Sequence, residues 1–200
     1  YTPEQAVRAF ILMVEYDRNQ QSLMQTPASA PDVFTGNESA VRSRLQAALN
    51  AGRTLLTEPE AKAVLEDYGI PTVPTRVAAT VEAAAAAATD IGYPVALKIL
   101  SPDLSHKSDV SGVLLDIGSV SILSAAAEGM IARIRHLQPQ ARVEGFTVQP
   151  MIRRPASHEL IVGVAEDPVF GPVLSFGQGG TAVEVLRDIA VALPPLNDLL

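Results

Sequence analysis

The stretch GYPVALKILSPDLSHKSDVSGV, residues 92–113, decides the fold class because it joins an apolar strand to a polar loop. Its segment VALKIL, residues 95–100, is apolar except for Lys98, which predicts a buried strand. A lysine there costs several kcal/mol unless its ammonium finds a partner or water. Two interpretations stay open: an edge strand whose Lys98 reaches solvent, or a cation directed into a cleft at a ligand phosphate.

The loop SPDLSHKSDVSG, residues 101–112, contains one histidine, His106, next to Lys107. Ser, Asp and Gly are ordinary loop residues, so a loop without a chemical role would have the same composition. A neighbouring cation favours neutral imidazole, which is a nucleophile that can accept a phosphoryl group. Backbone N–H groups of Ser- and Gly-rich turns can hold the phosphate oxygens. Of the other histidines, His136 suits the end of a helix, and His158 is undecided.

The composition of the 200-residue chain limits the classes of function. Hydrophobic residues make up 48% of it and Trp is absent, which indicates a mixed α/β protein and argues against disorder. The net charge of −7 argues against non-specific binding to nucleic acid or to an anionic membrane. Without cysteine there is no disulfide or thiolate chemistry. No apolar run approaches the roughly 20 residues that span a bilayer, so a cytoplasmic protein is expected.

Periodicity and capping signals predict helices that alternate with strands, followed by a run of strands, which indicates two lobes. Capping boxes at residues 2–5 and 57–60 begin two of the helices. A linker is predicted over 25–37. Helices are expected over 3–23, 39–51, 58–68, 81–91 and 119–136. Strands are expected over 95–100, 112–118, 143–152, 158–167 and 171–177, and near 183–185, with a short extended stretch within 70–78.

Four segments together resemble one family: LTEPEAKAVLEDYGIPTVPT (56–75), residues 92–113, EGFTVQPMIRRPASHELIVGVAEDPVFGPVLSFGQGGTAVEV (144–185) and ALPPLND (192–198). They are similar to the ATP-grasp region of NDP-forming acyl-CoA synthetases, which also occurs in lysine acetyltransferases fused to a GNAT domain. The resemblance covers about residues 54–200. It implies an ATP-grasp fold with its N-terminal lobe at 54–145 and the first part of a truncated C-terminal lobe at 146–200. Residues 1–53 would be a helical linker that follows a CoA-ligase-like domain.

The resemblance also implies the reaction acyl-CoA + ADP + phosphate ⇌ acid + CoA + ATP, through phosphohistidine. His106 matches the histidine that carries the phosphoryl group. Lys98 matches the lysine at the nucleotide α- and β-phosphates, and Lys107, which follows His106, is expected as a further nucleotide contact. Glu159 falls where relatives hold the ribose hydroxyls. The backbone expected to read the adenine edge belongs to Gln149, Pro150, Met151 and Ile152.

The chain departs from the family pattern in two places. Ser111-Gly112 replaces a pair of glycines, and a serine at φ > 0 costs about 1 kcal/mol or more. The acidic residues that bind Mg²⁺ in the family are expected beyond Leu200. The chain is therefore expected to be part of a longer polypeptide and a poor catalyst by itself. Its expected partners are a nucleotide, a CoA-ligase-like domain or subunit, and a second copy that covers exposed apolar surface.

Two other functions are compatible with part of the pattern. In GNAT-fused acetyltransferases the synthetase portion can be catalytically idle and act as a regulatory ligand-binding module. Retention of Lys98 and His106 argues against that function, whereas Ser111 favours it. Carboxylate–amine ligases share the ATP-grasp fold and would explain Lys98, but they need no phosphohistidine and leave the HKSD segment unexplained.

Overall fold

The computed structural model describes residues 2–24, 36–104, 107–155, 157–180 and 189–196. The chain divides into two compact units, residues 35–153 and residues 1–34 with 154–200. The predicted boundaries at 53/54 and 145/146 do not coincide with this division. The segment 36–53 belongs to the first unit, and so does the strand that begins at Gly145. The assignment of residues 54–145 and 146–200 to the two ATP-grasp lobes stays a prediction.

The first unit contains a four-stranded antiparallel sheet in the order β1-β4-β2-β3. Its strands are β1 (Arg76–Ala78), β2 (Val95–Leu100), β3 (Val113–Ile117) and β4 (Gly145–Pro150). The strand β2 pairs with β4 on one side and with β3 on the other, so Lys98 lies on a central strand. The edge-strand interpretation of Lys98 is therefore wrong, because neighbouring strands flank it on both sides.

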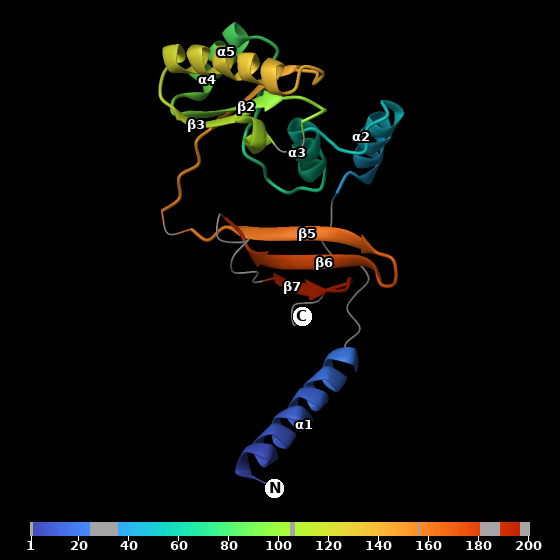
Figure 1. The fold of residues 1–200 in the computed structure, drawn as a ribbon. Coiled ribbons are helices and arrows are strands. Elements are labelled where there is room, and N and C mark those ends of the chain that lie inside the picture. Colours follow the sequence, from blue (N-terminus) through green and yellow to red (C-terminus); the bar gives the residue numbers. More distant parts are fainter. Residues whose placement is uncertain (1, 25–35, 105–106, 156, 181–188, 197–200) are drawn as a thin grey trace. The chain divides into compact units, whose positions relative to one another are not determined.

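Two helices, α4 (Val81–Ile91) and α5 (Val120–Leu137), cover one face of this sheet (Figure 1). Thr80 and Ser119 cap them by accepting backbone N–H groups of the first turn. The core between sheet and helices is closely packed. Its fully buried members include Ala84, Ala88, Val95, Leu97, Ile99, Leu123, Ala127, Ile134, Phe146 and Val148.

Side chains alternate along β2 and β4, so the opposite face of the sheet carries different residues. Leu97, Ile99 and Val148 enter the core, while Lys98 and Gln149 project to the other side. There they meet the start of α3 (Glu58–Asp67). The predicted capping box is present at that start: Glu60 Oε2 accepts from the Thr57 backbone N–H at 2.7 Å. The preceding helix α2 (Glu38–Asn50) is capped by Asn37 and contacts α3.

The second unit contains α1 (Pro3–Met24) and a three-stranded antiparallel sheet in the order β5-β6-β7. The strands β5 (Leu160–Asp167) and β6 (Gly171–Gln178) confirm two predicted strands. The strand β7 (Ile189–Ala192) was not predicted. The expected strand near 183–185 lies outside the described residues, and so does most of the expected linker at 25–37. None of the described helices is long and apolar enough to cross a membrane.

Candidate functional site

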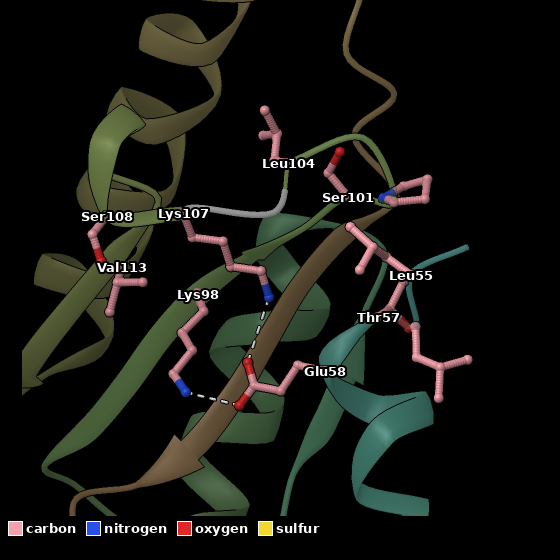
Figure 2. Close-up of a pocket in the computed structure, with 11 residues that line it drawn as sticks. Leu55, Thr57, Glu58, Lys98, Ser101, Leu104, Lys107, Ser108 and Val113 are labelled. Atoms are coloured by element: carbon pink, nitrogen blue, oxygen red, sulfur yellow. Dashed lines mark hydrogen bonds and ion pairs between the residues drawn. The ribbon is translucent and has the colours of Figure 1, made fainter. Parts of the chain in front are cut away.

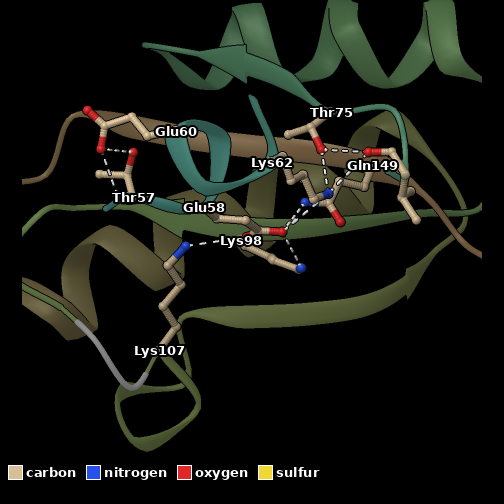
Figure 3. A network of polar contacts seen from close by, with 9 residues as sticks. Thr57, Glu58, Glu60, Lys62, Thr75, Lys98, Lys107 and Gln149 are labelled. Carbon is tan, nitrogen blue, oxygen red and sulfur yellow. Dashed lines mark hydrogen bonds and ion pairs between the residues drawn. The ribbon is translucent and has the colours of Figure 1, made fainter. Parts of the chain in front are cut away.

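The carboxylate of Glu58, the first residue of α3, is the centre of a polar network on the open face of the four-stranded sheet (Figure 3). Its Oε1 accepts from Lys98 Nζ at 2.8 Å and from Gln149 Nε2 at 2.6 Å. Lys107 Nζ lies 3.4 Å from Oε2, and Lys62 Nζ lies 3.5 Å from Oε1. These partners come from α3 itself, β2, β4 and the short 3₁₀ helix η1 (Lys107–Val110). One carboxylate therefore joins four separate elements.

The sequence contains three lysines, and all three meet this one carboxylate. Their side chains are 15–24% exposed, so water screens their charges only in part. Three ammonium groups against one carboxylate leave about two positive charges uncompensated within the network. Positive charges that are partly removed from water attract an anion, and a polyphosphate carries enough negative charge to balance them.

The pKa values of Glu58 and Lys62 depend on both burial and the neighbouring charges of this network. Burial acts to raise the pKa of Glu58, but hydrogen bonds from Lys98 and Gln149 and the charges of Lys98 and Lys107 outweigh it, and the pKa falls to about 2. Burial lowers the pKa of Lys62, an effect that the charge of Glu58 opposes and that of Lys98 reinforces. Glu58 is therefore ionised at any physiological pH.

The lysines do not have the same freedom to bind a ligand. Lys62 Nζ also donates to the Val73 carbonyl at 3.1 Å and to Thr75 Oγ1 at 2.7 Å. Because an ammonium has three N–H donors, Lys62 is fully occupied by protein acceptors. For Lys98 and Lys107, Glu58 is the one acceptor found among the described residues. Each of these two ammonium groups keeps donors for a ligand.

A cavity of about 540 Å³ opens beside the network (Figure 2). Lys98, Lys107 and Glu58 form its charged wall, and Thr57, Ser101 and Ser108 add hydroxyl groups. The apolar remainder comes from Leu55, Leu56, Pro102, Leu104 and Val113. The volume lies within the usual range for pockets that enclose a small molecule. The structure thus places Lys98 and Lys107 on one cavity wall, and their contact with a nucleotide stays a prediction.

The loop that carries His106 is fixed at both ends. On its N-terminal side, Arg142 donates to the Asp103 carboxylate from its backbone N–H at 2.8 Å and from its guanidinium at 3.0 and 2.8 Å. On its C-terminal side, Gly112 N–H donates to the Lys107 carbonyl at 2.6 Å, and Ile99 N–H donates to the Gly112 carbonyl at 2.8 Å. His106 itself lies outside the described residues, so its role stays a prediction.

The last turn of this loop contains Ser111 and Gly112, where the family pattern has two glycines. Ser111 has φ = +51°, the left-handed region in which the family's glycine would be unstrained. Gly112 is needed for a different reason. A Cβ there would lie 2.8 Å from Ile99 Cγ2 and 3.0 Å from the Lys107 carbonyl oxygen. The loop therefore keeps the glycine that close packing requires and replaces the one that the backbone conformation favours.

The segment 149–152 has the backbone expected to read an adenine edge. The side chain of Gln149 is committed to Glu58. The N–H of Met151 donates to the Pro94 carbonyl at 3.2 Å, so this donor is occupied in the structure. Pro150 has no N–H, and Ile152 is exposed. The predicted contact with adenine remains a prediction for this segment.

Glu159 belongs to the other compact unit and is described within it. Its carbonyl accepts from the Gly179 N–H at 2.8 Å. A Cβ on Gly180, where φ is +83°, would lie 2.8 Å from Glu159 Oε2. The two adjacent glycines of the FGQGG turn therefore give room to Glu159, which explains them without a ligand. The expected contact of Glu159 with a ribose stays untested.

A metal site does not emerge from the residues that the structure describes. Within those ranges no three His, Cys, Asp or Glu side chains come together closely enough to hold an ion. Glu58 is the one carboxylate among the described cavity residues, and the Lys98 and Lys107 ammonium groups beside it repel a cation. The described cavity residues therefore fit an anion and do not fit Mg²⁺.

Sequence reasoning identified Lys98, Lys107 and Gln149, which the structure brings to one network, but it missed Glu58. The residue stands between Thr57 and Glu60, both of which serve the capping box, and a glutamate at the start of a helix is ordinary. One signal was available: a chain with twelve arginines has only three lysines, and one of them, Lys62, follows Glu58 by one helical turn.

Comparison with known proteins gives a consistent result. Residues 47–200 match the family model described as ATP-grasp domain. The chain is 38% identical over 197 residues to ADP-forming acetate–CoA ligase I of Archaeoglobus fulgidus, covering 98% of this chain and 28% of that protein. It is 39% identical over 154 residues to the beta subunit of ADP-forming acetate–CoA ligase II of Pyrococcus furiosus, covering 77% and 64%. The chain thus spans about a quarter of the first relative's length and just under two thirds of the second's.

Solved structures of the dinucleotide forming acetyl-coenzyme A synthetase 1 of Ca. Korarchaeum cryptofilum are also similar. A complex with coenzyme A and Ca-AMPCP superposes with a TM-score of 0.73 at 40% identity, covering 79% of this chain and 68% of that one. A second complex, with coenzyme A and Mg-AMPPCP, is described as having its phosphohistidine segment pointing towards the nucleotide binding site. It has a TM-score of 0.63 at 37% identity and covers 80% and 66%.

Proposed function

The chain belongs to the ATP-grasp family, and from this membership we propose that it is the nucleotide-binding part of an ADP-forming acyl-CoA synthetase. The full reaction would convert acyl-CoA, ADP and phosphate into the free acid, CoA and ATP. The observation that carries the proposal is the cavity wall formed by Lys98 and Lys107. Their network holds about two positive charges more than Glu58 balances, which is the charge that a nucleotide diphosphate would neutralise.

The phosphoryl group would reach ADP through His106. Phosphate would displace CoA from acyl-CoA to give an acyl phosphate, and the imidazole nitrogen would then attack its phosphorus while the carboxylate leaves as the free acid. In the last step a β-phosphate oxygen of ADP would attack that phosphorus while the imidazole leaves. This transfer depends above all on positioning and on neutralising charge. His106 directly precedes Lys107, whose ammonium lies on the cavity wall. A solved relative with its phosphohistidine segment turned towards the nucleotide supports the assignment.

The other parts of the proposal concern the nucleotide and the assembly. The backbone of 149–152 would meet the adenine, and Glu159 would meet the ribose. Mg²⁺ would accompany the nucleotide, as in the relative solved with Mg-AMPPCP, and residues outside the described cavity would hold it. Relatives named as beta subunits support a partner that supplies the CoA-ligase-like domain.

The test is phosphoryl labelling of the full-length protein. Incubation with acyl-CoA and radiolabelled phosphate should give an acid-labile label on the protein, and addition of ADP should remove it as labelled ATP. His106→Ala should abolish the label, whereas His136→Ala, on the last turn of α5, should retain it. A label that persists in His106→Ala would show that the phosphoryl carrier has been assigned to the wrong residue.

A second candidate is the idle regulatory module of a GNAT-fused lysine acetyltransferase. The observation in its favour is the strained backbone at Ser111, which stiffens the loop that would have to move. Such a module would bind ADP but acquire no phosphoryl label in the same experiment. ADP binding together with labelling would therefore exclude it.

A further inference from the structure

Glu58 has no role among the residues that the sequence analysis singled out, yet Lys98, Lys107, Gln149 and Lys62 all contact its carboxylate. Its Oε1 accepts from Lys98 and Gln149, its Oε2 accepts from Lys107, and Lys62 Nζ forms an ion pair with Oε1 at 3.5 Å. A carboxylate offers about four lone-pair positions. Hydrogen bonds from Lys98 and Gln149 fill the two positions on Oε1, and Lys107 takes one on Oε2. As an acceptor with a negative charge, Glu58 does not itself attract an anionic ligand. Its effect on a ligand must pass through its partners.

The partners differ in what they can do next. Lys62 is held by Val73 and Thr75 as well as by Glu58, so it fixes the carboxylate rather than a ligand. Lys98 and Lys107 each give Glu58 one of their three donors and face the cavity with the others (Figure 2). A flexible lysine side chain loses considerable rotamer freedom when it is ordered on a ligand. Glu58 restricts both side chains before any ligand arrives.

We propose that Glu58 is a positioning residue: its two oxygens fix the spacing of the Lys98 and Lys107 ammonium groups so that both meet the diphosphate of one nucleotide. This inference rests on the proposed function. The alternative role for Glu58 is a resting counter-anion that phosphate must displace. The donor count favours positioning, because each lysine can hold Glu58 and a phosphate oxygen at the same time.

The same carboxylate connects two ends of the expected nucleotide site. Gln149, at the start of the segment expected to meet adenine, donates to Glu58 Oε1 at 2.6 Å, and Lys98 donates to the same atom at 2.8 Å. The side chains of Gln149, at the expected base-binding segment, and of Lys98, at the expected phosphate site, therefore donate to the same oxygen atom. A loss of Glu58 should disturb recognition of the phosphates most, because other bonds hold the nearby main chain: Gln149 and Pro150 pair with β2, and the Met151 N–H donates to the Pro94 carbonyl.

The test is a ligand series on the full-length protein, with adenosine, AMP and ADP titrated by calorimetry. Glu58→Gln should weaken ADP binding roughly tenfold or more, because two charge-assisted contacts lose their anchor. AMP binding should weaken less, and adenosine binding should change less than twofold. Glu58→Asp keeps the charge but shortens the reach, so it should restore part of the ADP affinity. The matched control is Glu66→Gln, the same substitution on α3 at a glutamate bonded to Thr72.

Each outcome bears on the proposal. A loss that grows with the number of phosphates, absent from Glu66→Gln, supports positioning. Tighter ADP binding by Glu58→Gln would overturn it and establish the counter-anion role. An equal loss for all three ligands would also overturn it, because a general structural defect does not distinguish phosphates. If the unsubstituted protein binds none of the three ligands, the proposed function itself fails, and the positioning role falls with it.

Discussion

The carboxylate of Glu58 and the ammonium of Lys98 lie 2.8 Å apart, although 40 positions separate the residues in the sequence. The contact joins the first turn of α3 to the middle of β2. It gives a lysine on a central, otherwise apolar strand the partner that its burial requires. It also leaves the lysine at the wall of a cavity rather than in bulk solvent.

Lys98 and Lys62 should respond differently to the same substitution. Lys98→Met removes a cation with free donors, so ADP affinity should fall about 10- to 100-fold while Glu58 keeps three other donors. Lys62→Met removes a cation whose donors all serve protein acceptors, so it should lower stability by about 1–3 kcal/mol instead. Thermal melting and ADP titration of both variants separate the two effects. Equal changes in the two variants would refute the division of roles.

Acid should weaken the first unit through Glu58. The folded-state pKa of about 2 lies below the usual value of 4.5, so the stabilisation is fully present above pH 4.5 and is lost as pH falls towards 2. The difference corresponds to on the order of 3 kcal/mol. Urea unfolding at pH 6 and pH 3 should show the larger part of this loss in the unsubstituted protein and a smaller loss in Glu58→Gln.

Glu60 should account for the dependence of stability on pH that remains in Glu58→Gln. Its ion pair with Arg53 and its bonds to Thr57 hold its pKa at about 2 as well, against the opposing effect of burial. Glu58→Gln should therefore reduce the dependence on pH without abolishing it. An identical dependence in Glu58→Gln and the unsubstituted protein would mean that Glu58 is not the group responsible.

Ser111→Gly should stabilise the protein by about 1 kcal/mol, because glycine adopts φ = +51° without the clash that a Cβ causes. The control is Ser108→Gly in the adjacent 3₁₀ helix, where no positive φ exists and glycine adds only unfolded-state entropy. Chemical denaturation measures both. If Ser111→Gly is as destabilising as Ser108→Gly, the backbone at residue 111 is not strained in solution.

Gly112→Ala should destabilise the loop and its attachment to β2. The new methyl group would meet Ile99 Cγ2 at 2.8 Å and the Lys107 carbonyl at 3.0 Å, and overpacking of this kind typically costs 1–3 kcal/mol. Gly118→Ala, where a Cβ meets nothing within 4 Å, is the matched control and should be close to neutral. Hydrogen exchange of the Gly112 and Ile99 amides reports whether the loss is local, since both bonds close this turn.

The features that sequence reasoning predicted correctly are those that depend on nearby residues. The capping box at Thr57 joins residues only three positions apart. The bounds of β2 follow from a continuous apolar run, VALKIL, that ends at a polar loop. The strand β7 was missed because its four residues, IAVA, have neither alternation nor a turn signal of a recognisable type.

The network around Glu58 could not be predicted in the same way. Its partners stand 40, 49 and 91 positions away, and only the sheet order and register bring them together. The choice between an edge and a central position for Lys98 depended on the same information, because β4 enters between β1 and β2 from far along the chain. The division of the chain at 153/154 likewise follows from strand pairing rather than from composition.

The four-stranded sheet separates two kinds of evolutionary freedom. On the side of α4 and α5, residues such as Ala84 and Ala88 are limited by volume, since a larger side chain has nowhere to go. On the side of Glu58, substitutions are limited by their effect on charge, since they do not disturb the packing of the sheet against α4 and α5. Selection can therefore retune preference among anionic ligands on one surface of β2 and β4 while the other surface preserves the architecture.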